Sequence, residues 1–198
     1  MIEKKNIKVE GGKRTAGQII KIARKLFSEL GYANTSIEKI VHEAGVTRGA
    51  LYHHFSSKKE LFMAVFEDAQ RDILERNIAA IEGLRDSWEK FTSSGAAFIK
   101  ACLEPEIRQI VLIDAPAIIG WDEWRGVDEK GVALLRQMIS NLLDEGLLKP
   151  LPLEALTHII SGATNEAVLW ISRHKNQKQA RSESGEVFNV ILNALRAK

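Results

Sequence analysis

The chain has 198 residues, of which 28 are Lys or Arg and 26 are Asp or Glu, giving a formal net charge of +2. This length suffices for a small domain followed by a second domain with its own core. No apolar run reaches the roughly 18 residues of a membrane span, and residues 1–14 lack the apolar stretch of a secretory signal. Cys102 is the single cysteine, which excludes an internal disulfide and leads us to expect a cytoplasmic protein.

Charge is unevenly distributed along the chain. Residues 1–60 contain 12 Lys and Arg against 6 Asp and Glu, a balance of +6, whereas the remainder contains 16 against 20, a balance of −4. A basic end on a slightly acidic body favours a polyanionic partner at that end. The alternative is a solvated surface with chance segregation of charge. Residues 1–12 are predicted to be a flexible basic tail, which either reaches DNA or is simply solvated.

The first predicted helix covers residues 19–30 and is amphipathic. Its buried stripe at steps of three and four residues consists of Ile20, Ala23, Phe27 and Leu30. Gly31 directly after it predicts a left-handed C-terminal cap.

Two capping boxes frame the next segments. Thr35 with Glu38 predicts the start of a second helix, and Ser57 with Glu60 predicts the start of a long fourth helix. The second helix has an apolar stripe of Ile37, Ile40, Val41 and Ala44.

Between these boxes, Gly45 predicts a tight turn and Thr47 the N-cap of a short third helix. Inward-facing anchors are predicted at Ala50, Leu51 and Phe55, with His54 packing beside Phe55. The outward face carries Arg48, Gly49, Tyr52 and His53. A short polar-faced helix after a glycine turn and another helix is typical of the helix-turn-helix, in which the second helix enters the DNA major groove.

Residues 13–65 also resemble the DNA-binding signature of the tetracycline-repressor-like (TetR) family of bacterial transcription regulators. The matching features, in order, are Phe27 with Gly31-Tyr32, the threonine-started segment 35–41, the segment 44–49, and Leu51-Tyr52 with His54-Phe55, Ser57-Lys58 and Leu61. One departure is His53, where the family more often has Tyr or Trp.

The DNA-binding residues predicted from this pattern are Thr35, Thr47, Arg48, Gly49, Tyr52, His53 and Lys58. Lys58 is expected at a phosphate near a helix N-terminus, and Arg48 at guanine or at a phosphate. Thr35 and Thr47 either contact phosphates or serve only as caps. Gly49 either permits close approach to the duplex or is merely tolerated in a short helix.

The rest of the chain predicts helices and no strand, so the expected fold is all-α with about nine helices. An N-terminal three-helix helix-turn-helix domain, 13–57, precedes a helical ligand-binding and dimerisation domain, 58–198. Helices are expected over about 58–81, 87–103, 106–113 with an interruption or end near Pro116, 121–144, 153–172 and 186–197, with a polar loop over 174–185.

Two helices near the C-terminus predict a dimer interface, because small and apolar residues recur at steps of three and four. The proposed interface residues are Ala155, Ile159, Gly162, Ala163, Glu166, Val187, Val190, Ile191 and Ala194. The resemblance implies a four-helix interface of this kind. The alternative is that these faces belong to the core of a monomer.

The resemblance further implies a small-molecule pocket in the second domain. Its candidate lining residues are Phe98, Cys102, Ile110, Ile113, Asp114, Trp121, Trp124, Met138, Asn165 and Leu169. Asp114 stands in an apolar run and is expected either to meet a ligand or to form a helix cap or salt bridge. For each of the others, ordinary core or surface is the alternative.

The preferred function is a homodimeric repressor that leaves a palindromic operator when an unidentified small molecule binds. The alternative is a DNA-binding regulator without a small-molecule effector, controlled by a protein partner. An enzyme is not expected, because the histidines form no metal-binding pattern and no phosphate-cradling glycine loop is present. No cofactor, metal or membrane partner is predicted.

Overall fold

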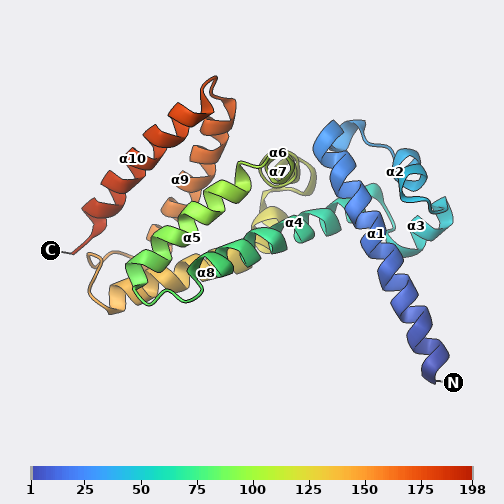
Figure 1. Cartoon of the computed structure of the whole chain (residues 1–198), viewed down its shortest axis with the longest axis horizontal. Coiled ribbons are helices and arrows are strands. Elements are labelled where there is room, and N and C mark those ends of the chain that lie inside the picture. Colours follow the sequence, from blue (N-terminus) through green and yellow to red (C-terminus); the bar gives the residue numbers. More distant parts are fainter. Residues whose placement is uncertain (1, 198) are drawn as a thin grey trace. The chain divides into compact units, whose positions relative to one another are not determined.

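The computed structural model describes residues 2–197, and the side chains of residues 14–197. The predicted all-α class is confirmed over this part of the chain, where the one β-type pairing is an isolated bridge between Leu148 and Arg196. The elements are α1 (Ile2–Asn34), α2 (Ile37–Ala44), α3 (Arg48–His54), α4 (Lys58–Ile81), α5 (Ser87–Cys102), α6 (Pro105–Arg108), the π-helix η1 (Gln109–Asp114), α7 (Ala115–Ile119), α8 (Trp121–Asp144), α9 (Leu153–Arg173) and α10 (Gln177–Leu195) (Figure 1).

The chain divides into two compact units. The DNA-side unit, named here for its helix-turn-helix, comprises the chain up to Ala69 together with Pro105–Trp124, and the C-terminal unit comprises Gln70–Glu104 together with the chain from Arg125 onward. This division differs from the expected boundary at residues 57–58. The first turns of α4 belong to the DNA-side unit because Leu61, Phe62, Val65 and Phe66 are all fully buried.

Helix α1 runs from Ile2 to Asn34 with a break at Gly31. Gly31 has φ 76° and ψ 162°, a combination open essentially only to glycine. The left-handed cap predicted at this position is wrong, because ψ lies outside the left-handed helical region; Gly31 instead forms a break within the helical span. At its other end the helix begins at Ile2, so the flexible tail predicted over residues 1–12 is wrong from Ile2 onward. This stretch contains no proline, the residue that most strongly stops a helix.

The predicted cap of α2 is wrong by one residue. Ser36 is the N-cap, and its hydroxyl accepts a hydrogen bond from the Lys39 N–H at 3.1 Å. Thr35 is only 1% exposed, and its hydroxyl lies 3.1 Å from the Leu26 carbonyl oxygen and 2.9 Å from that of Gly31. Two adjacent hydroxyl residues were both able to cap, and burial of Thr35 against α1 decides between them.

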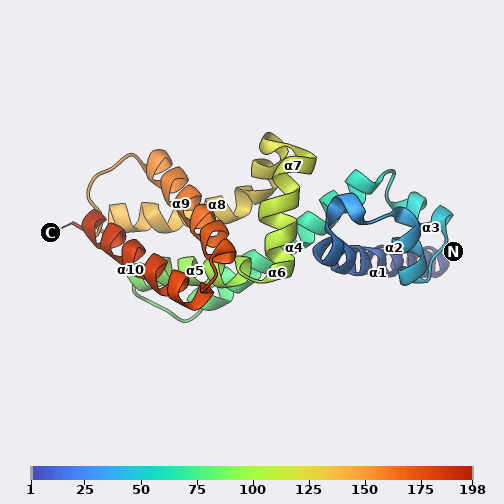
Figure 2. The ribbon, with the colours of Figure 1, turned by 90° about the horizontal axis from the view of Figure 1, so that it is seen from above.

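The segment after α5 also differs from expectation. Pro105 begins α6, and helix continues past Pro116 to Ile119 through η1, so that α6, η1 and α7 follow one another without a break (Figure 2). Proline lacks an N–H and its ring clashes with the carbonyl four residues earlier in a regular α-helix. A π-helical stretch directly before Pro116 changes that pairing, and the helix survives. Counted as one, these three elements leave nine helical segments over residues 2–197.

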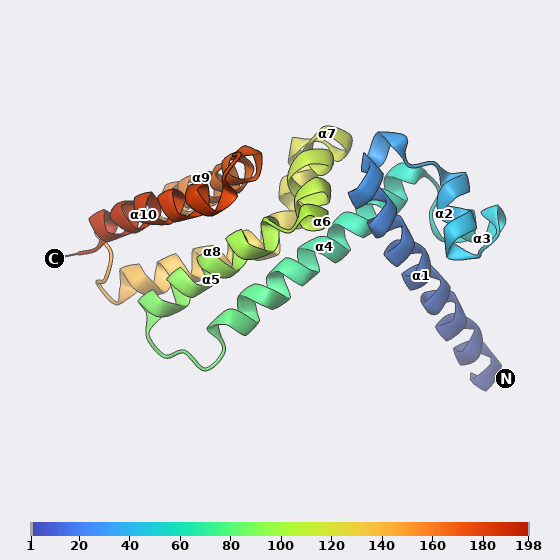
Figure 3. The same ribbon diagram turned by 45° about the horizontal axis from the view of Figure 1, so that its top comes forward.

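In the C-terminal unit, α5, α8 and α9 share a core. Its buried members are Phe91, Met138, Ile139, Leu142, Leu148 and Leu156, with Leu192 and Leu195 of α10 packed against them. Figure 3 shows α9 and α10 side by side. The predicted polar loop over 174–185 is wrong: α10 begins at Gln177 after the N-cap Asn176. Ala180 is fully buried and anchors the early turns, while the polar residues form an exposed face.

Replacing Thr35 by Val keeps its shape but removes the buried hydroxyl from two carbonyl oxygens. We expect the free energy of unfolding to fall by about 1–3 kcal/mol, measured by urea denaturation followed by circular dichroism. Thr35→Ser, which retains the hydroxyl, is the matched control and should lose less. Equal stability of Thr35→Val and the parent protein would contradict the assigned role.

Candidate nucleic-acid interface

The turn between α2 and α3 is built on Gly45. Its φ of 63° and ψ of 31° lie in the left-handed helical region, which glycine adopts without a Cβ penalty. Its N–H donates toward the carbonyl oxygens of Val41 and His42, closing the end of α2. The predicted glycine turn is confirmed, and it sets where α3 starts.

Helix α3 is held by its cap and by two apolar anchors. The Thr47 hydroxyl accepts a hydrogen bond from the Ala50 N–H at 3.1 Å, which confirms Thr47 as the N-cap. Leu51 is fully buried and Phe55 nearly so. The His54 ring lies 6.3 Å from the Phe55 ring, in agreement with the packing role predicted for it.

The opposite face of α3 is exposed, as the sequence predicts. Arg48, Gly49, Tyr52 and His53 are all exposed, and Tyr52 retains 40% of its accessible surface. The face therefore offers a guanidinium, a phenol and an imidazole beside a position without a side chain, a set able to donate to phosphates and base edges.

Arg48 is oriented by two neighbours. Its Nη1 lies 2.8 Å from Oε1 of Glu38 on α2, and its guanidinium carbon lies 5.5 Å from the centre of the Tyr52 ring. Glu38 was predicted only as part of a capping box, so this partner was missed. Its ten-residue separation from Arg48 carries no periodic signal; only the folded turn brings the two together.

Gly49 has no packing reason to be glycine. A Cβ placed there would meet nothing closer than the Thr47 hydroxyl oxygen, at 4.0 Å. Its backbone is helical and needs no positive φ. Neither packing within the chain nor backbone conformation therefore requires glycine at this position. Close approach of another molecule to the backbone is a reason for the absence of a side chain.

Lys58 is the first residue of α4. Ser57 caps this helix by accepting from the Glu60 N–H at 3.1 Å, and the Glu60 carboxylate accepts from the Ser56 N–H at 2.7 Å, so the predicted cap is confirmed. The Lys58 ammonium lies 4.2 Å from the centre of the Tyr32 ring, and partial burial lowers its pKa. Tyr32 in turn packs against Phe27 and Phe62.

The expectation that Thr35 contacts a phosphate is contradicted by its burial and by its inward hydrogen bonds. Ser36 takes the exposed position at the start of α2. Phosphate or base contacts by the remaining predicted residues stay predictions.

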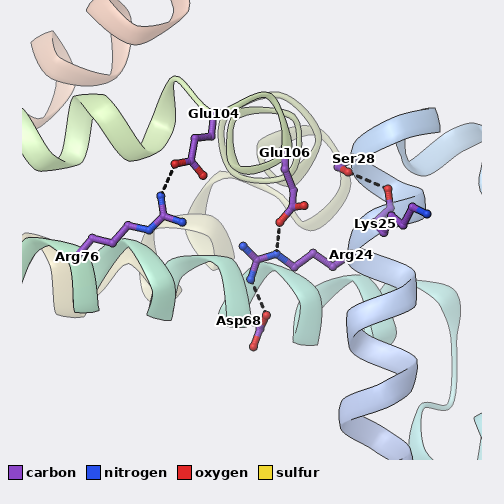
Figure 4. A network of polar contacts seen from close by, with 7 residues as sticks. All are labelled: Arg24, Lys25, Ser28, Asp68, Arg76, Glu104 and Glu106. Atoms are coloured by element: carbon purple, nitrogen blue, oxygen red, sulfur yellow. Dashed lines mark hydrogen bonds and ion pairs between the residues drawn. The ribbon is translucent and has the colours of Figure 1, made fainter.

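An ion-pair network joins three helices of the DNA-side unit. Arg24 of α1 directs Nη1 to Asp68 of α4 at 2.7 Å and Nε to Glu106 of α6 at 2.6 Å (Figure 4). The Asp114 carboxylate accepts from the Tyr32 N–H at 3.0 Å and from the Gln109 amide at 3.1 Å. Segment 105–124 is thereby fastened to the helix-turn-helix.

The predicted pocket residues do not gather in one unit. Ile110, Ile113, Asp114, Trp121 and Trp124 fall in the DNA-side unit, whereas Phe98, Cys102, Met138, Asn165 and Leu169 fall in the C-terminal unit. Several have structural roles that the sequence did not reveal.

Asp114 caps the turn at Tyr32, which matches the capping alternative rather than the ligand one. Trp124 is buried, donates to the Val111 carbonyl at 2.8 Å, and stacks on Trp121 at 4.9 Å. Met138 belongs to the C-terminal core.

Over the described residues, no group of three His, Cys, Asp or Glu side chains is arranged to hold a metal ion. No helix among those residues is long and apolar enough to cross a membrane.

Comparison with known proteins gives the same picture along the chain. Residues 19–65 match the family described as "Bacterial regulatory proteins, tetR family", and residues 88–195 match "Tetracyclin repressor-like, C-terminal domain". The Tn10 transposon TetC protein of Escherichia coli is 29% identical over 191 residues, covering 96% of this chain and 94% of that protein.

Solved structures agree. A TetR-family transcriptional regulator from Pectobacterium atrosepticum is 34% identical, with a TM-score of 0.82 over 96% of this chain and 97% of that one. A further TetR-type protein from a Shewanella species, at 21% identity and a TM-score of 0.75 over 93% and 99% of the two chains, shares the fold.

The glycine turn, the short exposed helix and the helical body define a helix-turn-helix transcription regulator. The chain belongs to the TetR family. Members of this family are DNA-binding transcriptional regulators and not enzymes.

Changing Glu38 to Gln removes the carboxylate beside Arg48. The pair is exposed, so stability should change by less than about 1 kcal/mol. Binding to an unrelated duplex at low salt should tighten by a few-fold, since a negative charge leaves the predicted DNA-binding surface. Fluorescence anisotropy measures this.

The control is Glu43→Gln, an exposed carboxylate about 140° around the same helix. An equal effect of both changes, or weaker binding by Glu38→Gln, would contradict the placement of Glu38 on the DNA side.

Proposed function

We propose that the chain is a dimeric repressor that binds a palindromic operator and leaves it when a small molecule occupies the C-terminal unit. The observation that carries the DNA-binding part is the exposed face of α3. Four of the predicted contact residues share it, and glycine stands at 49 without an internal reason.

The excess of positive charge supports the same surface. Residues 1–60 contain 12 basic and 6 acidic residues. Electrostatic attraction between such an excess of positive charge and DNA phosphates is strongly salt-dependent. Lys58 is our candidate for a phosphate contact and Arg48 for a base contact.

Dimerisation is supported by exposed apolar side chains on α9 and α10. All nine residues proposed for the interface are exposed in the single chain, including Ile159 at 68% and Val190 at 66%. Large exposed apolar patches mark interaction surfaces. The monomer-core alternative predicts burial of these residues, which is not what the chain has.

Two copies of α3 related by a two-fold axis suit a palindrome whose half-site centres are about 34–36 Å apart.

Release by a ligand requires that the ligand bind unequally to the conformation with high affinity for DNA and to the one with low affinity. A coupling of about 1–3 kcal/mol alters operator affinity roughly 5- to 150-fold. The repressor assignment is supported by relatives with that printed name, such as the transcriptional repressor AcnR of Corynebacterium glutamicum, 26% identical over 145 residues.

Arg48→Ala and Lys58→Ala should weaken operator binding in different ways. Arg48→Ala should cost about 1–3 kcal/mol and relax preference at one position per half-site. Lys58→Ala should weaken binding to all sequences and lower the salt slope by roughly one unit per protomer. Anisotropy titrations over a salt series, on the operator and on point-substituted operators, separate the two. Uniform weakening by Arg48→Ala would move that residue to the backbone, and an unchanged salt slope would remove Lys58 from the phosphates.

Val190→Asp should convert the dimer to a monomer, because it places a carboxylate in an apolar interface. Sedimentation velocity gives the mass directly. Ile78→Asp is the matched control, since Ile78 is also an exposed apolar residue, at 51%, but lies on α4. A Val190→Asp protein that remains dimeric would refute the α9–α10 interface.

A further inference from the structure

Glu38 lies beside the exposed face of α3, although it belongs to α2. It is in the first turn of α2, and the turn at Gly45 brings the two helices into contact (Figure 1). Its Oε1 lies 2.8 Å from Nη1 of Arg48, the first residue of α3. Among the described residues, this carboxylate from the other helix is the one hydrogen-bond acceptor that Arg48 meets.

The Arg48 guanidinium is restrained from two directions. Glu38 accepts from Nη1, and the ring of Tyr52, one helical turn along α3, has its centre 5.5 Å from the guanidinium carbon. A guanidinium is a planar fork of N–H donors. The edge formed by Nε and Nη2 meets no acceptor among the described residues. Such an edge matches the O6 and N7 acceptors that guanine presents in the major groove.

Stability does not account for this pair. The Arg48 and Glu38 side chains keep 64% and 63% of their accessible surface, and ion pairs so exposed contribute little to folding. A carboxylate beside a face that meets phosphates also lowers affinity for every duplex. Its place in the first turn favours α2 through the helix dipole, but that effect does not require Arg48 as a partner. An effect on the recognition of DNA remains as the reason for the pair.

We propose that Glu38 is a specificity-determining residue, which positions the Arg48 guanidinium so that its Nε–Nη2 edge reads guanine. A free arginine side chain samples many rotamers, and ordering it on binding costs entropy. A guanidinium held before DNA arrives loses less entropy and presents one edge in one orientation. Glu38 thus lowers affinity for DNA in general and raises discrimination between sequences. This inference rests on the proposed function, in which Arg48 contacts a base.

Two neutral variants separate the charge of Glu38 from its hydrogen bond. Glu38→Gln and Glu38→Ala remove the same negative charge, but only glutamine keeps a side-chain oxygen that can accept from Arg48. The position is exposed, so both variants should fold, which circular dichroism checks. Both should bind an unrelated duplex a few-fold more tightly than the parent at low salt, and to the same extent.

Discrimination is measured by fluorescence anisotropy on the full-length protein, with an operator obtained by selection from random duplexes. Guanines are replaced by 7-deazaguanine, which lacks the N7 acceptor, one position at a time in both half-sites. At one position the parent should lose about fivefold or more in affinity, and Glu38→Ala less than about twofold. Glu38→Gln should fall between them. Arg48→Ala should be insensitive there, and the control Glu43→Gln should keep the factor of the parent.

Three results would overturn the positioning role. The first is an unchanged factor in Glu38→Ala, which would leave Glu38 acting through its charge alone. The second is an equal factor in the two neutral variants, because the hydrogen bond would then make no difference. The third is a preference lost at a cytosine on point-substituted operators. A carboxylate accepts from the cytosine N4 amino group, so Glu38 would then read a base itself.

Operator binding by the parent protein keeps the two proposals apart. A parent protein that binds its operator, but is insensitive to 7-deazaguanine at every guanine, overturns the inference alone. Failure of the ligand-free parent protein to bind any operator overturns the proposed function itself.

Discussion

A seven-residue helix has too few hydrogen bonds to persist by itself, so α3 depends on what holds it. The left-handed turn at Gly45 sets its start, the Thr47 hydroxyl caps it, and Leu51 and Phe55 fix it to the core of the DNA-side unit. These constraints determine which side chains remain outside. The exposed face that we propose for DNA binding consists of the side chains that stay outside once these anchors are buried.

The same unit extends well beyond the helix-turn-helix. Arg24 joins α1 to α4 and α6, and Asp114 joins η1 to the turn at Tyr32. Segment 105–124 therefore belongs with the DNA-binding helices. The chain crosses between the two units at residues 69–70, 104–105 and 124–125. The functional division thus cuts through α4 and α8.

Local signals in the sequence were sufficient for much of this. Gly45, Thr47 and the Ser57 cap act over three or four residues, and α4 and α8 end as expected, shortly before Gly83 and Gly146, which have positive φ. The exposed face of α3 followed from the same spacing. Exposure of the proposed interface on α9 and α10 likewise agrees with a pattern visible in the sequence.

What the sequence did not reveal depends on partners far along the chain. Thr35 and Ser36 are equivalent as caps until α1 buries one of them. The sequence leaves Asp114 open between a ligand contact and a cap or salt bridge, because its partner, the Tyr32 N–H, is 82 residues away. Residues 177–185 are too polar to suggest a helix, yet one buried alanine anchors them. Glu38 likewise became visible as the partner of Arg48 only in the folded chain.

The most direct measurement is selection of bound duplexes from a random oligonucleotide pool by the full-length, ligand-free protein. The account predicts enrichment of an inverted repeat, with half-sites whose centres lie one helical turn of DNA apart or a whole number of turns. Enrichment of no sequence over the starting pool, at salt concentrations that suppress non-specific binding, would contradict it.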